Sequence, residues 1–101
     1  MVRDLRFTSA AARDIEELEQ YSATEFGSSA TAEYLGGLRE ALVRLRDYPG
    51  MGVLRHDLRP DTRSLRYLSH RIYYRPVPGG ILIQRVLHYA RQVRREMIDD
   101  L

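Results

Sequence analysis

The sequence contains no cysteine, which excludes disulfide frameworks, thiolate zinc sites and cysteine nucleophiles. It also contains no lysine, so all 16 basic side chains are arginines. No hydrophobic run approaches the ~20 residues that a membrane-spanning helix needs, and the first residues lack the apolar stretch of a signal peptide. We therefore expect a soluble cytoplasmic protein without a membrane partner. At 101 residues and 44% hydrophobic residues, the chain is expected to form a single domain, residues 1–101.

Charge is distributed unevenly along the chain. Residues 1–50 hold 6 arginines and 9 acidic residues, a net charge of −3. Residues 51–95 hold 10 arginines against only Asp57 and Asp61, a net charge of +8. The net charge of the whole chain, +2, therefore does not reveal this strongly positive segment. Such a segment attracts nucleic-acid phosphate or an acidic protein partner.

The first half of the chain is typical of a strand followed by a helical hairpin. Val2–Phe7 alternates as a short strand, and Thr8 or Ser9 can cap a helix that ends at Gly27. A second helix follows, and its apolar stripe consists of Tyr34, Leu38, Ala41, Leu42, Leu45 and Tyr48. Gly36-Gly37 interrupts this helix, and we expect it to permit close approach of another backbone, that of the first helix. The short link between the two helices predicts an antiparallel pair.

The second half changes to β-rich patterns. Arg63–Leu68, His70–Arg75 and Ile81–His88 are predicted strands, and Pro78-Gly79 fits a type II turn between the last two. Ala90–Leu101 can form a last short helix, with Val93, Met97 and Leu101 four residues apart. The predicted order is β-α-α-β-β-β-α. This is an α+β fold, with the N-terminal strand and helical hairpin packed on a small antiparallel sheet.

No known catalytic signature is present, and the three histidines lack the spacing of metal ligands, so we expect neither a metal nor a cofactor. Arg71, His88 and Tyr89 are the residues with catalytic potential. An RNase that leaves a cyclic phosphate needs a base, an acid and a cation, which His, Tyr and Arg can supply. In the alternative interpretation, His88 caps a strand, Tyr89 packs its ring and Arg71 is solvated or ion-paired.

Other arginines indicate binding or structure. An arginine-rich surface interleaved with tyrosines could bind nucleic acid or an acidic amphipathic peptide, and it comprises Arg59, Arg63, Arg66, Arg71 and Arg75 with Tyr67, Tyr73 and Tyr74. We favour the peptide because the acid-rich first half would repel a nucleic-acid track. Arg85 falls between Ile83 and Leu87 on one strand face. A structural ion pair with a helix carboxylate, Asp14 or Glu17, is the expected reason.

Together these segments resemble the RelE/ParE superfamily of type II toxin–antitoxin toxins, and specifically its ParE branch. The resemblance runs from Ala11-Ala12-Arg13-Asp14-Ile15 through Pro49-Gly50-Met51-Gly52 to Ser69-His70, and it is most specific at Arg85-Val86-Leu87-His88 followed by Arg91. The chain departs from the ParE pattern at Gln92, where many ParE-like chains carry an acid, and at His70-Arg71-Ile72-Tyr73-Tyr74 and His88-Tyr89, which resemble the YoeB type. It also lacks the lysine-rich catalytic cluster of RelE-like chains.

The resemblance implies a toxin that inhibits DNA gyrase without being an enzyme and forms a hetero-oligomer with its antitoxin. The implied antitoxin-binding residues are Arg59, Arg63, Arg66, Arg71, Tyr73, Arg75, Val93 and Met97. The alternative is a RelE/YoeB-like endonuclease that cuts mRNA on the ribosome. In that branch Arg71 would clamp the phosphate, His88 would act as base or acid, and Tyr89 would assist it.

Overall fold

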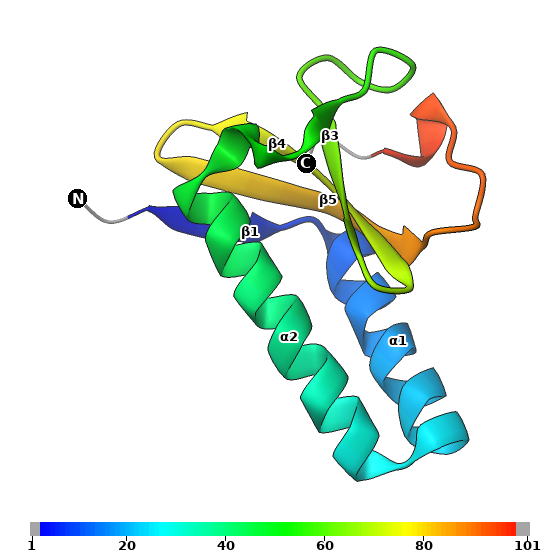
Figure 1. Cartoon of the computed structure of the whole chain (residues 1–101). Coiled ribbons are helices and arrows are strands. Elements are labelled where there is room, and N and C mark those ends of the chain that lie inside the picture. Colours follow the sequence, from blue (N-terminus) through cyan, green and yellow to red (C-terminus); the bar gives the residue numbers. More distant parts are fainter. Residues whose placement is uncertain (1–2, 99–101) are drawn as a thin grey trace.

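The computed structural model describes residues 3–98 and has the α+β architecture that the sequence predicts. A helical hairpin lies against one face of a five-stranded sheet of order β1-β5-β4-β3-β2 (Figure 1). The helices are α1 (Ser9–Phe26) and α2 (Ser28–Asp47), and the strands are β1 (Asp4–Phe7), β2 (Val53–Leu54), β3 (Arg63–Tyr67), β4 (His70–Val77) and β5 (Gly80–His88). Two short 3₁₀ helices complete the fold, η1 (Pro49–Met51) and η2 (Arg95–Met97).

The helical hairpin begins and turns where the sequence predicts. The Thr8 hydroxyl caps α1 by accepting a hydrogen bond from the Ala11 amide at 3.0 Å. Gly27 connects the two helices with a φ of 89°, a backbone conformation that favours glycine. The stripe on α2 is buried at Leu38, Ala41, Leu42 and Leu45, whereas Tyr48 at its end is 66% exposed. The hairpin therefore packs on the sheet through this half of α2, together with Ala11 and Ile15 of α1.

Of the glycine pair in α2, Gly37 permits close approach of a side chain from the sheet, not of the α1 backbone as expected. A Cβ at Gly37 would collide with the Tyr67 hydroxyl, whereas a Cβ at Gly36 would meet nothing within 4 Å. The close neighbour is therefore a side chain from β3 rather than the backbone of α1. The missing side chain lets the Tyr67 hydroxyl reach α2, where it donates a hydrogen bond to the Tyr34 carbonyl at 3.0 Å.

The sheet is mixed rather than antiparallel. β1 runs parallel to β5, with Leu5 opposite Ile81, while the other neighbouring strands are antiparallel. In the sequence, α1 and α2 follow β1 and lead the chain to β2 at the opposite edge of the sheet. The antiparallel strands then return to β1, and a parallel pair such as β1 and β5 requires a long connection of this kind. β2 is an additional two-residue edge strand that the sequence did not indicate.

The helix predicted over Ala90–Leu101 is wrong within the described residues. Only the 3₁₀ turn η2 forms, and residues 99–101 lie outside the described residues. Ile98 is fully buried with Tyr73 and Leu58, and Val93 packs against the same cluster. The spacing of apolar residues in this segment could support only a short helix of marginal stability. Packing of the segment on the sheet is more favourable than forming that helix.

The two sheet faces have different environments. The face toward the helices holds Ile72, Tyr74, Ile81, Ile83 and Val86, which join the hydrophobic core. The opposite face, called the outer face below, contains Tyr73 and the residues paired with it, Ser64 and Arg85. No helix of residues 3–98 is long and apolar enough to span a membrane.

Candidate functional site

Three predicted arginines share the outer face of the sheet. Arg71 and Arg75 alternate with the core residues of β4, and Arg66 of β3 stands directly opposite Arg71. We call Arg66, Arg71 and Arg75 the arginine face. Like charges directly opposite each other destabilise a sheet, and strands β2 to β5 contain no acidic residue. The arrangement concentrates positive charge where a negative partner could neutralise it.

Arg66 is held in place by uncharged groups. Its Nε donates a hydrogen bond to the Leu68 carbonyl at 2.8 Å, and its guanidinium carbon lies 3.7 Å from the centre of the Tyr89 ring. A cation over an aromatic face is favourable and keeps the full positive charge. Tyr89 therefore positions a cation at the border of the arginine face.

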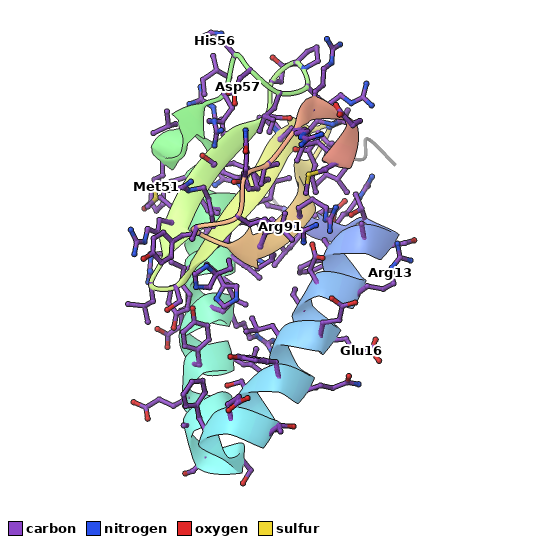
Figure 2. The ribbon with its side chains drawn as sticks, turned by 90° about the vertical axis from the view of Figure 1, so that its right-hand side faces the viewer. Arg13, Glu16, Met51, His56, Asp57 and Arg91 are labelled. Carbon is purple, nitrogen blue, oxygen red and sulfur yellow. The ribbon has the colours of Figure 1, made fainter. Side chains whose placement is uncertain are left out.

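The other predicted antitoxin-binding residues are engaged within the chain. Arg63 points to the helix side, paired with Tyr74, and donates to the Gly52 carbonyl at 2.8 Å. Arg59 donates to the Ile98 carbonyl at 3.1 Å, and Tyr73 is only 1% exposed. Val93 and Met97 belong to the C-terminal segment, which runs in front of the strands in Figure 2. The structure thus separates Arg63 from the arginine face and places the remaining four beneath or within that segment.

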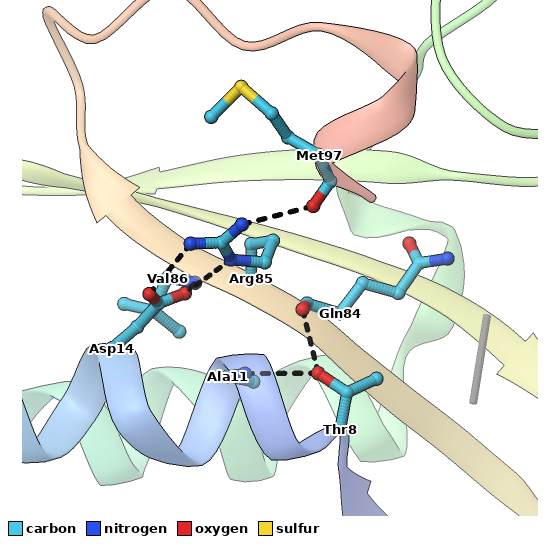
Figure 3. Close-up of polar contacts among 7 residues, drawn as sticks. All are labelled: Thr8, Ala11, Asp14, Gln84, Arg85, Val86 and Met97. Carbon is cyan, nitrogen blue, oxygen red and sulfur yellow. Dashed lines mark hydrogen bonds and ion pairs between the residues drawn. The ribbon is translucent and has the colours of Figure 1, made fainter. Parts of the chain in front are cut away.

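The ion pair expected between Arg85 and Asp14 is present and is bidentate, with distances of 2.8 and 2.9 Å (Figure 3). A β-bulge at Gln84 shifts the register so that Ile83 opposes Tyr74 while Arg85 opposes Tyr73. Arg85 therefore lies on the outer face, not beside Ile83 as the spacing predicted.

Asp14 also satisfies the backbone of the bulge. Its Oδ2 accepts the Val86 amide hydrogen at 3.0 Å, and the Thr8 hydroxyl donates to the Gln84 carbonyl at 2.8 Å. Arg85 additionally donates to the Met97 carbonyl at 3.0 Å. Hydrogen bonding to Asp14 raises the pKa of Arg85 above its usual value despite partial burial. This network links α1, β5 and the C-terminal segment.

The predicted nuclease residues do not converge on one face. Arg71 pairs with Leu87 on the outer face, whereas His88 pairs with His70, whose ring hydrogen-bonds to Tyr34 of α2. The sheet therefore separates the expected phosphate clamp from the expected base. Tyr89 does stack on His88, with ring centres 4.9 Å apart.

A histidine pair lies at the open end of the sheet. The rings of His70 and His88 are 5.8 Å apart, and His70 Nδ1 is 2.8 Å from the Tyr34 hydroxyl. Burial, and secondarily the charge of His88, lowers the pKa of His70 below 6.5. Burial likewise raises the pKa of Tyr34. Both shifts in pKa favour the neutral form of the group.

These histidines border a groove that the sequence reasoning missed. The groove has a volume of about 340 Å³ and lies between the hairpin and the ends of β4 and β5. We call it the hairpin groove, and its main lining residues are Leu18, Tyr21, Phe26, Tyr34, His70 and His88. The sequence feature that could have indicated this groove is the apolar set Leu18, Tyr21 and Phe26. This set continues along α1, which extends beyond the end of the sheet (Figure 1).

Comparison with known proteins identifies the family. The family model described as "ParE toxin of type II toxin-antitoxin system, parDE" matches residues 5–93. The chain belongs to the ParE toxin family. Its relatives include Toxin ParE1 of Caulobacter vibrioides, 28% identical over 96 residues that cover 95% of this chain and 99% of that protein. Toxin ParE1 of Mycobacterium tuberculosis H37Rv is 30% identical over 89 residues, covering 87% and 91%.

The ParE assignment agrees with the fold. The chain superposes on a solved structure titled "Chromosomal ParDE TA system from P. aeruginosa" with a TM-score of 0.71 at 20% identity, covering 86% of this chain and 96% of that one. At this identity the likeness concerns the fold alone.

Within residues 3–98 of this ParE-family chain, no group of three or more potential ligands among His, Asp and Glu is placed to hold a metal ion.

Proposed function

We propose that this ParE-family chain is a toxin that inhibits DNA gyrase and is neutralised by an antitoxin encoded beside it. The antitoxin would lay an acidic amphipathic segment across the arginine face. The observation that carries this proposal is the direct opposition of Arg66, which is exposed, and Arg71, which is half-buried, on two strands without an acidic residue. A carboxylate from a partner would relieve that repulsion and gain charge-assisted hydrogen bonds.

The proposed interface is narrower than the sequence indicated. Arg66 and Arg71 oppose each other on the outer face, whereas Arg63 lies on the helix side and Arg59 donates to the Ile98 carbonyl. Tyr73 is covered by Ile98, so an antitoxin would reach it only by displacing the C-terminal segment. Val93 and Met97 lie in that segment and would form one edge of the interface.

Charge reversal tests the antitoxin interface. The triple variant R66E/R71E/R75E should bind the antitoxin about a hundredfold more weakly and with a smaller dependence on salt, because attraction becomes repulsion. The matched control R13E/R39E/R44E changes the same net charge on exposed helical positions. Equal affinities and salt slopes for the two triple variants would contradict the interface.

A supercoiling assay tests the target. Purified gyrase with the toxin should lose supercoiling activity and leave linear plasmid, while cellular mRNA stays intact by primer extension. The nuclease alternative has less support because Arg71 and His88 lie on opposite faces of the sheet. Codon-phased mRNA cuts that disappear in His88→Ala would overturn the gyrase assignment.

A further inference from the structure

The hairpin groove is a second exposed surface, separate from the arginine face. Both helices extend past the end of the sheet (Figures 1 and 2), which leaves the inner side of their far halves uncovered by strands. Tyr21 is 63% exposed and Phe26 is 67% exposed, although both lie at groove positions of α1. Large apolar side chains gathered around a hollow mark an interaction site more often than scattered ones do.

The helical hairpin around this groove is rich in negative charge. Residues 14–38 contain six acidic residues and no arginine, in a chain whose total is +2. Glu17 lines a second hollow of about 340 Å³ that shares Leu18 and Tyr21 with the groove. Glu25 follows Tyr21 by four residues and therefore lies on the same side of α1.

The opposite wall carries the same sign. Glu33 precedes Tyr34 on α2, and with burial as the main cause, the charges of Glu40 and Glu33 help to raise the pKa of Tyr67. The second hollow is also lined by Asp14, which pairs with Arg85, and by Arg91. Glu17 and Glu25 on α1 and Glu33 on α2 thus lie near an apolar hollow, with Arg91 at the side of the second hollow.

We propose that the hairpin groove docks a protein segment whose apolar side chain enters between Tyr21, Phe26 and Tyr34 while flanking arginines or lysines pair with Glu17, Glu25 and Glu33. An amphipathic basic helix has this chemistry. An acidic segment is disfavoured here and favoured on the arginine face, so the two surfaces select partners of opposite charge. The inference goes beyond the proposed function, since it rests on the groove alone and does not require gyrase or the antitoxin.

Two synthetic peptides of 14 residues test the proposal by titration into the ¹⁵N-labelled full chain. One is an amphipathic helix of leucine and arginine, and the other has every arginine replaced by glutamate. The basic peptide should shift the amide signals of Leu18, Tyr21, Phe26 and Tyr34. The acidic peptide should shift signals of the arginine face instead. Shifts from the basic peptide spread over all acidic positions, or groove shifts with the acidic peptide, would overturn the proposal.

Variants separate the apolar and charged contributions. Y21S/F26S should weaken binding of the basic peptide at least tenfold, whereas Tyr48→Ser, an equally exposed aromatic at the other end of α2, should not. E17Q/E25Q/E33Q should weaken it about tenfold at low salt. Glu16→Gln, on the outer side of α1 in Figure 2, is the control. Equal effects of groove and control variants would refute the site.

A second copy of this chain is the competing occupant, because its own arginine face is basic. Such head-to-tail contact would be open-ended and concentration-dependent. Sedimentation of the chain alone should show a monomer up to the concentrations of the titration. Oligomers that dissociate in Y21S/F26S but not in Tyr48→Ser would assign the groove to self-association and overturn the proposed partner.

Discussion

Removal of the Asp14 carboxylate should strongly destabilise the fold. Asp14 is 8% exposed, and it accepts two hydrogen bonds from Arg85 and one from the Val86 amide. Breaking a buried ion pair costs about 3–5 kcal/mol, and an orphaned buried donor costs about 1–3 kcal/mol. The Arg85 side chain is 17% exposed and keeps its bond to the Met97 carbonyl, so the lower end applies. We expect Asp14→Ala to cost about 3 kcal/mol.

The amide variant separates the two roles of the carboxylate. In Asp14→Asn the side-chain oxygen can still accept the Val86 hydrogen, but the neutral amide no longer pairs with Arg85. Asp14→Asn should therefore cost about 2 kcal/mol, roughly 1 kcal/mol less than Asp14→Ala. In a domain of this size, 1 kcal/mol corresponds to about 4–8 °C of melting temperature, so both losses are measurable.

A double-mutant cycle isolates the pair itself. Urea unfolding of wild type, D14N, R85M and D14N/R85M gives the free energy of coupling. The double variant should be more stable than the sum of the single losses predicts, by about 2 kcal/mol, because it leaves neither charge without its partner. A coupling below about 0.5 kcal/mol would refute the reasoning, since the pair would then behave as an exposed surface contact.

Three further predictions concern other parts of the fold. Gly36→Ala should stabilise the chain by up to about 1 kcal/mol through helix propensity, whereas Gly37→Ala should be at least 1 kcal/mol less stable than Gly36→Ala because its methyl group collides with Tyr67. Thr8→Val should cost about 2 kcal/mol by removing two hydrogen bonds of the hydroxyl, and Thr8→Ser should restore most of it. The depressed pKa of His70 means that its contribution to stability is complete above pH 6.5 and is lost as the pH falls below that value, so His70→Asn should flatten the stability profile between pH 7 and pH 5.

Each of these has a control and a contradicting outcome, all read by urea unfolding. Equal stabilities for the two alanine variants would show that Tyr67 moves without cost. If Thr8→Ser is as unstable as Thr8→Val, the loss of stability comes from packing of the methyl group and not from the hydrogen bonds of the hydroxyl. His56→Gln, at an exposed loop position, should leave the pH profile unchanged. A profile for His70→Asn that matches wild type would contradict the burial argument.

Local signals were sufficient for most of the fold. Caps, glycines and periodicity located both helices and three main strands, because these depend on neighbours in sequence. The parallel pairing of β1 was not predictable from the same signals, since it depends on where the hairpin returns the chain. The C-terminal segment was mispredicted for a related reason. Val93 and Ile98 gain more by packing on Tyr73 and Leu58 than a short helix gains from its own hydrogen bonds.

The candidate site was predictable only in part. Alternation along β4 correctly separated Arg71 and Tyr73 from Ile72 and Tyr74, but alternation failed on β5, where the bulge at Gln84 inserts one residue. A bulge has no reliable signature in a single sequence. Charge counting found the arginine-rich half but could not tell that Arg63 faces the helices, because that depends on the pairing register with Tyr74.

Charge compensation in this chain follows burial, and this explains which arginines are available to a partner. Arg85 is partly buried and opposite the buried Tyr73, so desolvation would be costly without Asp14, and the pair is present. Arg66 is exposed and Arg71 is half-buried, and their opposition costs only about 0.2–1 kcal/mol. A single carboxylate on β2 or β4 would remove even this cost, yet β2 to β5 contain none. The sheet thus keeps a small repulsion that an external acidic segment can relieve, and the energy of relief adds to the affinity for that segment.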